Sequence, residues 1–121
     1  MKIGIPKEIK DHEFRVGATP SGVMALSNAG HEVLIESGAG AAIGFSDDMY
    51  RSAGARPVSR EDVYACPMVI KVKEPQPSEY PLLWEGQVLF AYLHLAPDPE
   101  QTRALVERKV VKMRFLKKLP D

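Results

Sequence analysis

The stretch that decides the fold is Gln87 to Pro97, which reads Gln-Val-Leu-Phe-Ala-Tyr-Leu-His-Leu-Ala-Pro. Val88 to Leu93 is a continuous apolar run with Gly86 before it and Pro97 after it. A run of this length is too short for a typical helix, and it suits a strand that is buried on both faces of a parallel sheet. The run ends on His94, so this imidazole is expected at the carboxyl end of a strand, where open α/β sheets bind their ligands.

A second apolar segment has the same design. Met68 to Val72 is followed by Lys73, Glu74 and Pro75. Because the carboxyl ends of parallel strands meet at one edge of the sheet, two polar and titratable strand ends predict a site there. The alternative for His94 is a histidine whose hydrogen bonds are satisfied within the core, which is a common arrangement.

Strands and helices alternate along the rest of the chain. Strands are expected at residues 2–5, 31–36, 55–58, 68–73, 88–93 and 110–115, and helices at 20–29, 47–53, from 59 onward, 78–84 and 98–108. Thr19-Pro20 and Ser46 are typical helix starts, and Gly30 and Gly54 are typical helix stops. The pattern predicts one α/β domain, a parallel sheet flanked by helices of the flavodoxin-like or Rossmann-like kind.

The composition is that of an ordinary soluble protein, with 45% apolar and 26% charged residues and a net charge of zero. Five of the sixteen basic residues lie in the last thirteen positions, which leaves eleven basic and fifteen acidic residues before them. This body gives no reason to expect nucleic acid. The single cysteine, Cys66, has no partner for an internal disulfide, and no apolar run has the length of a membrane span. A cytoplasmic location is expected.

Three cationic or titratable side chains are candidates for chemistry. Arg15 lies in a long charged loop after the first strand, and Lys73 and His94 follow two later strands. Together they would bind and process a small anion: Arg15 would hold a carboxylate with its planar fork, Lys73 would neutralise charge, and His94 would move a proton. The alternative for Arg15 and Lys73 is that both are solvated surface charges.

Other candidate motifs carry less chemistry. Residues 38–44 contain three glycines after a strand, but the third glycine comes one position late for a dinucleotide fingerprint and no clear helix begins there, so a glycine-rich turn is the preferred interpretation. No histidine, cysteine or acidic cluster has metal-ligand spacing. Cys66 and His94 could meet in principle, but nothing in the sequence orients either for nucleophilic catalysis.

Several motifs in series resemble one known family. They are Ile5-Pro6-Lys7-Glu8, Glu13-Phe14-Arg15-Val16, Thr19-Pro20, Ala29-Gly30-His31-Glu32-Val33, Glu36-Ser37-Gly38-Ala39-Gly40, Lys71-Val72-Lys73-Glu74-Pro75 and Tyr92-Leu93-His94-Leu95-Ala96. In this order they resemble the amino-terminal domain of alanine dehydrogenase, over roughly residues 1–111. Related domains occur in proton-translocating nicotinamide nucleotide transhydrogenase, but the lysine and histidine motifs resemble those of the dehydrogenases.

The resemblance implies a reaction. Alanine dehydrogenases convert L-alanine, NAD and water reversibly into pyruvate, ammonia and NADH. By similarity Arg15 and Lys73 would hold the substrate carboxylate, and His94 would act as acid and base. The resemblance also implies a homo-oligomer, which is a hexamer in the intact family.

Two departures from the family bear on this expectation. Residues 112–121 form a basic tail that does not resemble the family, and the second, NAD-binding domain of the family has no counterpart in the sequence. The first hypothesis is therefore a substrate-binding domain, incomplete at its carboxyl-terminal end and truncated before the NAD domain, that is inactive alone and binds no NAD. The alternatives are a non-catalytic module that binds a carboxylate or docks on another chain, and a transhydrogenase-type domain.

Overall fold

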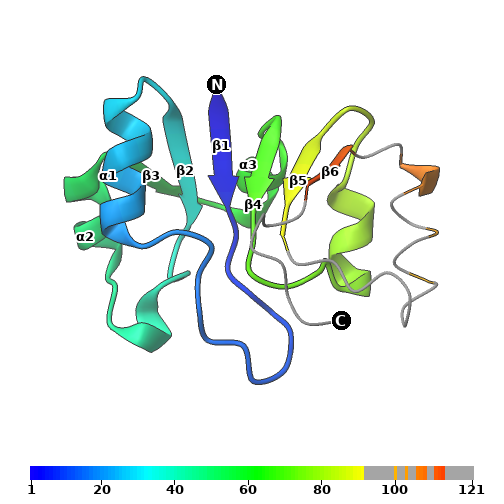
Figure 1. The fold of residues 1–121 in the computed structure, drawn as a ribbon. Coiled ribbons are helices and arrows are strands. Elements are labelled where there is room, and N and C mark those ends of the chain that lie inside the picture. The colour runs from blue at the N-terminus through cyan, green and yellow to red at the C-terminus, as the bar shows by residue number, and fades with distance from the viewer. Residues whose placement is uncertain (92–99, 101–102, 104–105, 109–110, 114–121) are drawn as a thin grey trace, which may run out of the picture.

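Short apolar segments form a single parallel sheet at the centre of the molecule (Figure 1). The computed structural model describes residues 1–91, 100, 103, 106–108 and 111–113. The strands are β1 (Lys2–Ile5), β2 (Glu32–Glu36), β3 (Ala55–Val58), β4 (Met68–Ile70), β5 (Val88–Phe90) and β6 (Val111–Met113). Their order in the six-stranded sheet is β3-β2-β1-β4-β5-β6, and every neighbouring pair is parallel. The α/β prediction is confirmed, and this order is that of the Rossmann arrangement.

Hydroxyl side chains start three α-helices in the part of the chain before residue 92. These are α1 (Pro20–Asn28), α2 (Asp47–Ala53) and α3 (Arg60–Tyr64), and two short 3₁₀ helices, η1 (Ala41–Ile43) and η2 (Pro77–Leu82), lie in the connections. Thr19, Ser46 and Ser59 accept hydrogen bonds from the N–H groups of Gly22, Met49 and Asp62, each at 3.2 Å. Each cap satisfies a donor that the first helical turn would otherwise leave unpaired.

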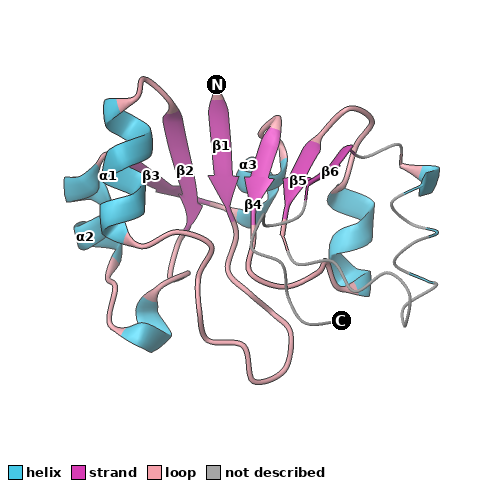
Figure 2. Cartoon of the chain, in the orientation of Figure 1, coloured by secondary structure: helices cyan, strands magenta, loops and turns pink. Residues whose placement is uncertain are grey.

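The two faces of the sheet are covered by different helices (Figure 2). On one face Ile5, Val33 and Ile35 pack in a core cluster with Val23 of α1 and Tyr50 of α2. On the other face a second cluster joins α3 to β4 and β5. Because side chains alternate across a strand, the sheet is buried on both faces, as parallel sheets are.

Close packing of α3 depends on Gly4, the residue of β1 that faces this helix. A Cβ atom at position 4 would lie 2.3 Å from the carbonyl oxygen of Val63. We expect Gly4→Ala to lower the free energy of unfolding by about 1–3 kcal/mol, because α3 must move away from the sheet. Gly22→Ala is the matched control, since the nearest atom to its added Cβ is 3.6 Å away. Urea unfolding of both variants measures the difference, and equal midpoints would contradict it.

Three predicted elements differ in the structure, two in the residue at which they end and one in the type of helix. β4 stops at Ile70 rather than at residue 73, because the N–H groups of Val72 and Lys73 donate to a side chain instead of a neighbouring strand. The described part of β5 ends at Phe90 rather than at residue 93, and residues 92–99 lie outside the described residues. The segment predicted as a helix at 78–84 is the 3₁₀ helix η2, in which Pro81 lacks the N–H that an α-helical hydrogen bond would need.

The carboxyl-terminal part of the chain is described only in pieces. β6 pairs with β5, so the last predicted strand is confirmed in its central part. The predicted helix at 98–108 falls largely outside the described residues. Within the described part of the chain, no helix is both long enough and apolar enough to cross a membrane.

Candidate functional site

The strand order creates a switch point between β1 and β4. The chain runs outward from β1 to β2 and β3 in one direction, and from β4 to β5 and β6 in the other. Ligands of open α/β sheets bind at such a point, outside the carboxyl ends of the strands. Residues 6–19 follow β1 and residues 71–76 follow β4, and both segments leave the sheet at the same lower edge in Figure 1.

A buried carboxylate joins these two segments. Glu8 Oε1 accepts hydrogen bonds from Lys71 Nζ at 3.2 Å and from the Lys73 N–H at 3.1 Å, and Glu8 Oε2 accepts one from the Val72 N–H at 3.0 Å. The side chains of Glu8 and Lys71 are each 1% exposed. Both charges are therefore removed from water and compensated by each other and by backbone dipoles.

The ammonium group of Lys71 lies between two carboxylates. Its Nζ is 3.5 Å from Glu79 Oε2, which also accepts a hydrogen bond from the Tyr64 hydroxyl at 2.6 Å. Burial, and then the negative charge of Glu79, raise the pKa of the Tyr64 hydroxyl. Glu79 Oε1 accepts from the Gln76 N–H at 2.8 Å, so the segment after β4 is held at both of its ends.

A further ion pair crosses between the two segments nearer the surface. Lys10 Nζ donates to Glu74 Oε1, and the Glu74 side chain is buried while that of Lys10 is half-buried. The Glu74 carbonyl oxygen accepts from Gln76 Nε2 at 2.9 Å. The loop after β1 therefore contacts the segment after β4 through two separate acid–lysine pairs.

Arg15 binds a carboxylate of its own loop. Its backbone N–H and its Nε donate to Glu13 Oε2, each at 2.9 Å, and its Nη2 donates to Glu13 Oε1 at 2.7 Å. This guanidinium–carboxylate pairing, with smaller help from the charge of Lys73, lowers the pKa of Glu13 to about 2. Glu13 thus occupies the guanidinium fork of Arg15 as a substrate carboxylate would.

The outcome for the predicted site differs from residue to residue. Arg15 lies on the loop after β1 and Lys73 on the segment after β4, both at the carboxyl edge of the sheet, and their role in a site stays a prediction. His94 lies outside the described residues, so its place at the site stays a prediction. Glu8, Glu13 and Lys71 were missed. A lysine between Ile70 and Val72 in an apolar segment was a usable signal, because a buried ammonium needs a carboxylate partner.

The pairing of Glu13 with Arg15 predicts a pH dependence. The folded pKa of about 2 lies below the ordinary value of 4.5, so the pairing stabilises the loop above pH 4.5 and this contribution is lost as the pH falls towards 2. We expect Arg15→Gln to return the Glu13 pKa towards 4.5 in a carboxyl-carbon NMR titration. Glu36, whose pKa is raised by burial, serves as the internal control. An unchanged Glu13 midpoint would show that Arg15 is not the cause.

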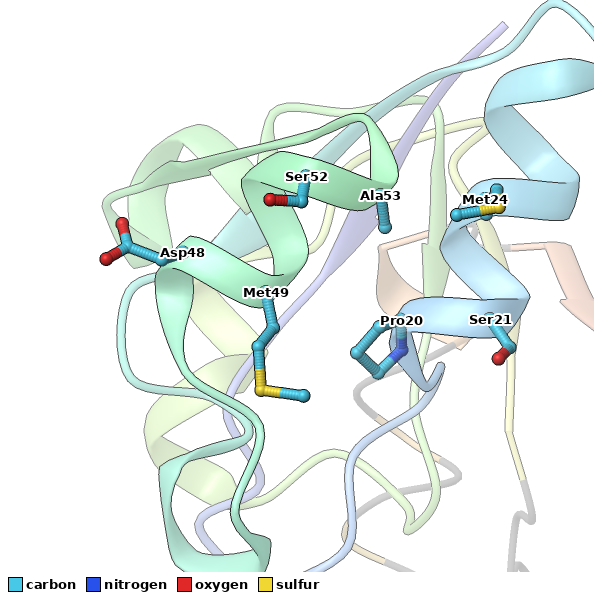
Figure 3. A pocket seen from close by; sticks show the side chains of 7 residues that line it. All are labelled: Pro20, Ser21, Met24, Asp48, Met49, Ser52 and Ala53. Atoms are coloured by element: carbon cyan, nitrogen blue, oxygen red, sulfur yellow. The ribbon is translucent and has the colours of Figure 1, made fainter.

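A cleft lies beside Arg15. It has a volume of about 320 Å³ and is lined by residues 7–15 and by Gly38, Ala39, Ala41 and Ala42. A second hollow of about 420 Å³ lies between α1 and α2, and its lining side chains are drawn in Figure 3. The lining of this second hollow contains Met24, Met49 and Asp48 but no basic residue, and Asp48 is paired with Arg51. Only the first cleft has basic side chains in its lining, and there Lys7, Lys10 and Arg15 lie with the acidic Glu8, Asp11 and Glu13.

The glycine-rich turn after β2 lacks the long helix that a dinucleotide fingerprint requires. After β2 the glycine-rich turn leads into η1, which has three residues, so no long helix presents its amino end to a pyrophosphate. Gly38 and Gly44 have positive φ angles of 82° and 87°, which explains two of the glycines as turn residues. Among the described residues, no group of three or more histidine, cysteine, aspartate or glutamate side chains is arranged to hold a metal ion.

Curated relatives and solved structures resemble this chain over most of its length. It is 53% identical over 112 residues to an alanine dehydrogenase of Bilophila wadsworthia, covering 92% of this chain and 30% of the relative. It is 53% identical over 123 aligned positions to alanine dehydrogenase 2 of Staphylococcus aureus, covering 100% of this chain and 33% of the relative. The chain thus spans about a third of the length of these relatives.

Two solved structures share the fold. An L-alanine dehydrogenase superposes with a TM-score of 0.92 at 50% identity, covering 94% of this chain and 32% of that chain. A transhydrogenase from Sinorhizobium meliloti superposes with a TM-score of 0.89 at 26% identity, covering 94% of this chain and 33% of that chain. The likeness is greater to the dehydrogenase.

The family model matches residues 4–115. The boundary predicted at residue 111, and the tail at 112–121 predicted not to resemble the family, stay predictions. With 112 of its 121 positions matched, the chain belongs to the family described as alanine dehydrogenase/PNT, N-terminal domain.

Proposed function

We propose that this chain is the substrate-binding domain of an alanine dehydrogenase, an enzyme that converts L-alanine, NAD and water to pyruvate, ammonia and NADH. The observation that carries the proposal is the two-pronged pairing of Arg15 with the Glu13 carboxylate, on a loop that Glu8 joins to the segment that carries Lys73 at the switch point of the sheet. The guanidinium fork already binds a carboxylate in a two-pronged geometry. The carboxylate of L-alanine or pyruvate is the same chemical group.

The three site residues have two roles in this proposal, binding of the substrate carboxylate and transfer of a proton. Arg15 and Lys73 bind the substrate carboxylate, which takes the place of Glu13 at the guanidinium group. His94 moves the proton, since an imidazole titrates near neutrality. The higher identity to alanine dehydrogenases than to the transhydrogenase favours the dehydrogenase over the transhydrogenase alternative.

Turnover is not proposed for this chain by itself. Oxidation of L-alanine requires a hydride acceptor, and NAD serves as this acceptor when it is bound. The glycine-rich turn after β2 leads into the three-residue η1 rather than a long helix, and we expect neither NAD binding nor dehydrogenation from the isolated chain. The cytoplasmic location and the homo-oligomeric state implied by the family belong to the same proposal.

Calorimetric titration of the purified chain with pyruvate tests the carboxylate site. We expect saturable heat, and a loss of affinity of about ten- to hundredfold in Arg15→Gln and Lys73→Gln, because each removes a charged hydrogen bond. Arg56→Gln is the matched control, since this exposed guanidinium lies 3.9 Å from Glu32 on the far side of β2. Absence of heat at millimolar pyruvate, or equal affinity in all three variants, would reject the proposal.

A second candidate function is a non-catalytic module that docks on an NAD-binding chain. It is favoured by two apolar side chains, Ile9 and Phe14, which are exposed on the loop that carries Arg15. Size-exclusion chromatography with the isolated NAD-binding domain of a relative would test it. Docking predicts co-elution that Phe14→Ser abolishes, with Met24→Ser as the control on a different exposed surface. Separate elution of the two chains would argue against it.

A further inference from the structure

We propose that Glu8 is a positioning residue: its buried carboxylate fixes the backbone that presents Lys73 at the switch point, so carboxylate binding depends on Glu8 without contact between Glu8 and the ligand. The inference deepens the proposed function, because it rests on Lys73 being a ligand for the substrate carboxylate. The N–H groups of Val72 and Lys73 donate to the two oxygens of Glu8.

Both oxygens of Glu8 are already occupied. One accepts from Lys71 Nζ and from the Lys73 N–H, and the other accepts from the Val72 N–H, at 3.0–3.2 Å. The side chain is 1% exposed, so it is closed to solvent. Glu8 therefore acts on a ligand only through the groups that it holds.

Glu8 decides where β4 ends and how the chain turns. The Lys71 N–H still donates to the Phe90 carbonyl oxygen at 3.0 Å, as a strand residue does. The next two N–H groups donate to Glu8 instead, and the strand stops. A carboxylate that takes two successive backbone donors fixes the orientation of that peptide segment, and here the second donor belongs to Lys73 itself.

The same carboxylate ties the two halves of the site together. Glu13 and Arg15 lie on the loop that contains Glu8, whereas Lys73 lies 65 residues after Glu8 in the chain. The hydrogen bonds from the Val72 and Lys73 N–H groups to Glu8 fix the backbone of Lys73 relative to the loop that carries Arg15. Glu79 holds the other end of the segment through the Gln76 N–H, and Glu8 holds the end next to Lys73.

The first variant to test is Glu8→Gln. Glutamine keeps the size of the side chain, but one carboxylate oxygen becomes an amide nitrogen that donates, so at least one of the held donors loses its acceptor. We expect hydrogen exchange at the Val72 and Lys73 amides to accelerate at least tenfold more than exchange at β1 amides. We also expect pyruvate affinity to fall at least tenfold in the folded full chain.

The control must remove buried hydrogen bonds without touching Lys73. Gln87 is fully buried at the amino end of β5, and its Nε2 donates to the carbonyl oxygens of Tyr64 and Cys66 at 2.7 and 3.1 Å. We expect Gln87→Met to lower stability while pyruvate affinity stays within threefold of the wild type. A purely structural role of Glu8 predicts instead that both variants lose affinity in proportion to their loss of stability.

A second variant covers the case in which Glu8→Gln does not fold. Glu8→Met combined with Lys71→Met removes the acid and the ammonium together, so no unpaired lysine is left in the core. Glu79 loses the ammonium but keeps its hydrogen bonds from the Tyr64 hydroxyl and the Gln76 N–H. We expect the same rapid exchange at Val72 and Lys73 and the same loss of affinity. Unchanged exchange and affinity in this variant would overturn the positioning role. If the wild-type chain binds no pyruvate, the proposed function fails, whereas the exchange experiment still decides the role of Glu8.

Discussion

Replacement of Lys71 by methionine is expected to lower the free energy of unfolding by about 3–5 kcal/mol. The variant keeps the length of the side chain but removes the ammonium group that lies between the carboxylates of Glu8 and Glu79. Two buried acids would then face each other without a compensating charge. Urea unfolding followed by circular dichroism measures the loss, which is a large part of the stability of a domain of this size.

The same substitution at Lys2 is the matched control. Lys2 Nζ lies 3.9 Å from Glu32 on the surface of the same sheet, and both side chains are more than half exposed. Exposed pairs of this kind contribute about 0–1 kcal/mol, so Lys2→Met should be nearly neutral. Similar losses of unfolding free energy in the two variants would mean that burial does not determine how much the Lys71 ion pairs contribute to stability.

The second large effect concerns His94 in an intact alanine dehydrogenase that carries this domain. We expect His94→Ala to lower kcat by about 10²- to 10⁴-fold, the usual cost of losing a general acid or base. Arg15 and Lys73 would still hold the carboxylate, so substrate binding should fall far less. Steady-state kinetics with L-alanine and NAD measure the two effects separately.

Arg15→Lys is the comparison for that experiment. It keeps the positive charge but loses the two-pronged geometry, so its effect should fall mainly on KM. If His94→Ala kept nearly full kcat while its affinity collapsed, His94 would be a binding residue. The proton would then have to move through Lys73 or a water molecule.

The fold class could be predicted because each element carries local signals. Thr19, Ser46 and Ser59 cap helices, and buried apolar runs mark strands, so alternation of the two leads to a parallel sheet. The order of the strands was not accessible in this way. Which strand lies next to β1 depends on packing between segments far apart in sequence, and no local pattern records it.

The candidate site could be predicted only in part for the same reason. Arg15 and Lys73 were accessible because strand ends of a parallel sheet share one edge. The pairing of Arg15 with Glu13 depends on the conformation of a loop without helix or strand periodicity. The end of β4 depends on Glu8, which is 64 residues from Val72, so counting apolar residues placed that end too late.

The buried pair of Glu8 and Lys71 has a consequence for the order of events during synthesis. The pair closes a chain segment of 63 residues, which contains β2, β3 and the three α-helices. A ribosome that has released only the first half of this segment exposes Glu8 without Lys71, Val72 and Lys73, the residues after β4 that donate hydrogen bonds to it. Closing so long a loop costs conformational entropy, and packing of the sheet must offset this cost before the pair forms. A nascent chain halted before residue 71 would therefore contain Glu13 and Arg15 but not the segment after β4 that Glu8 joins to their loop.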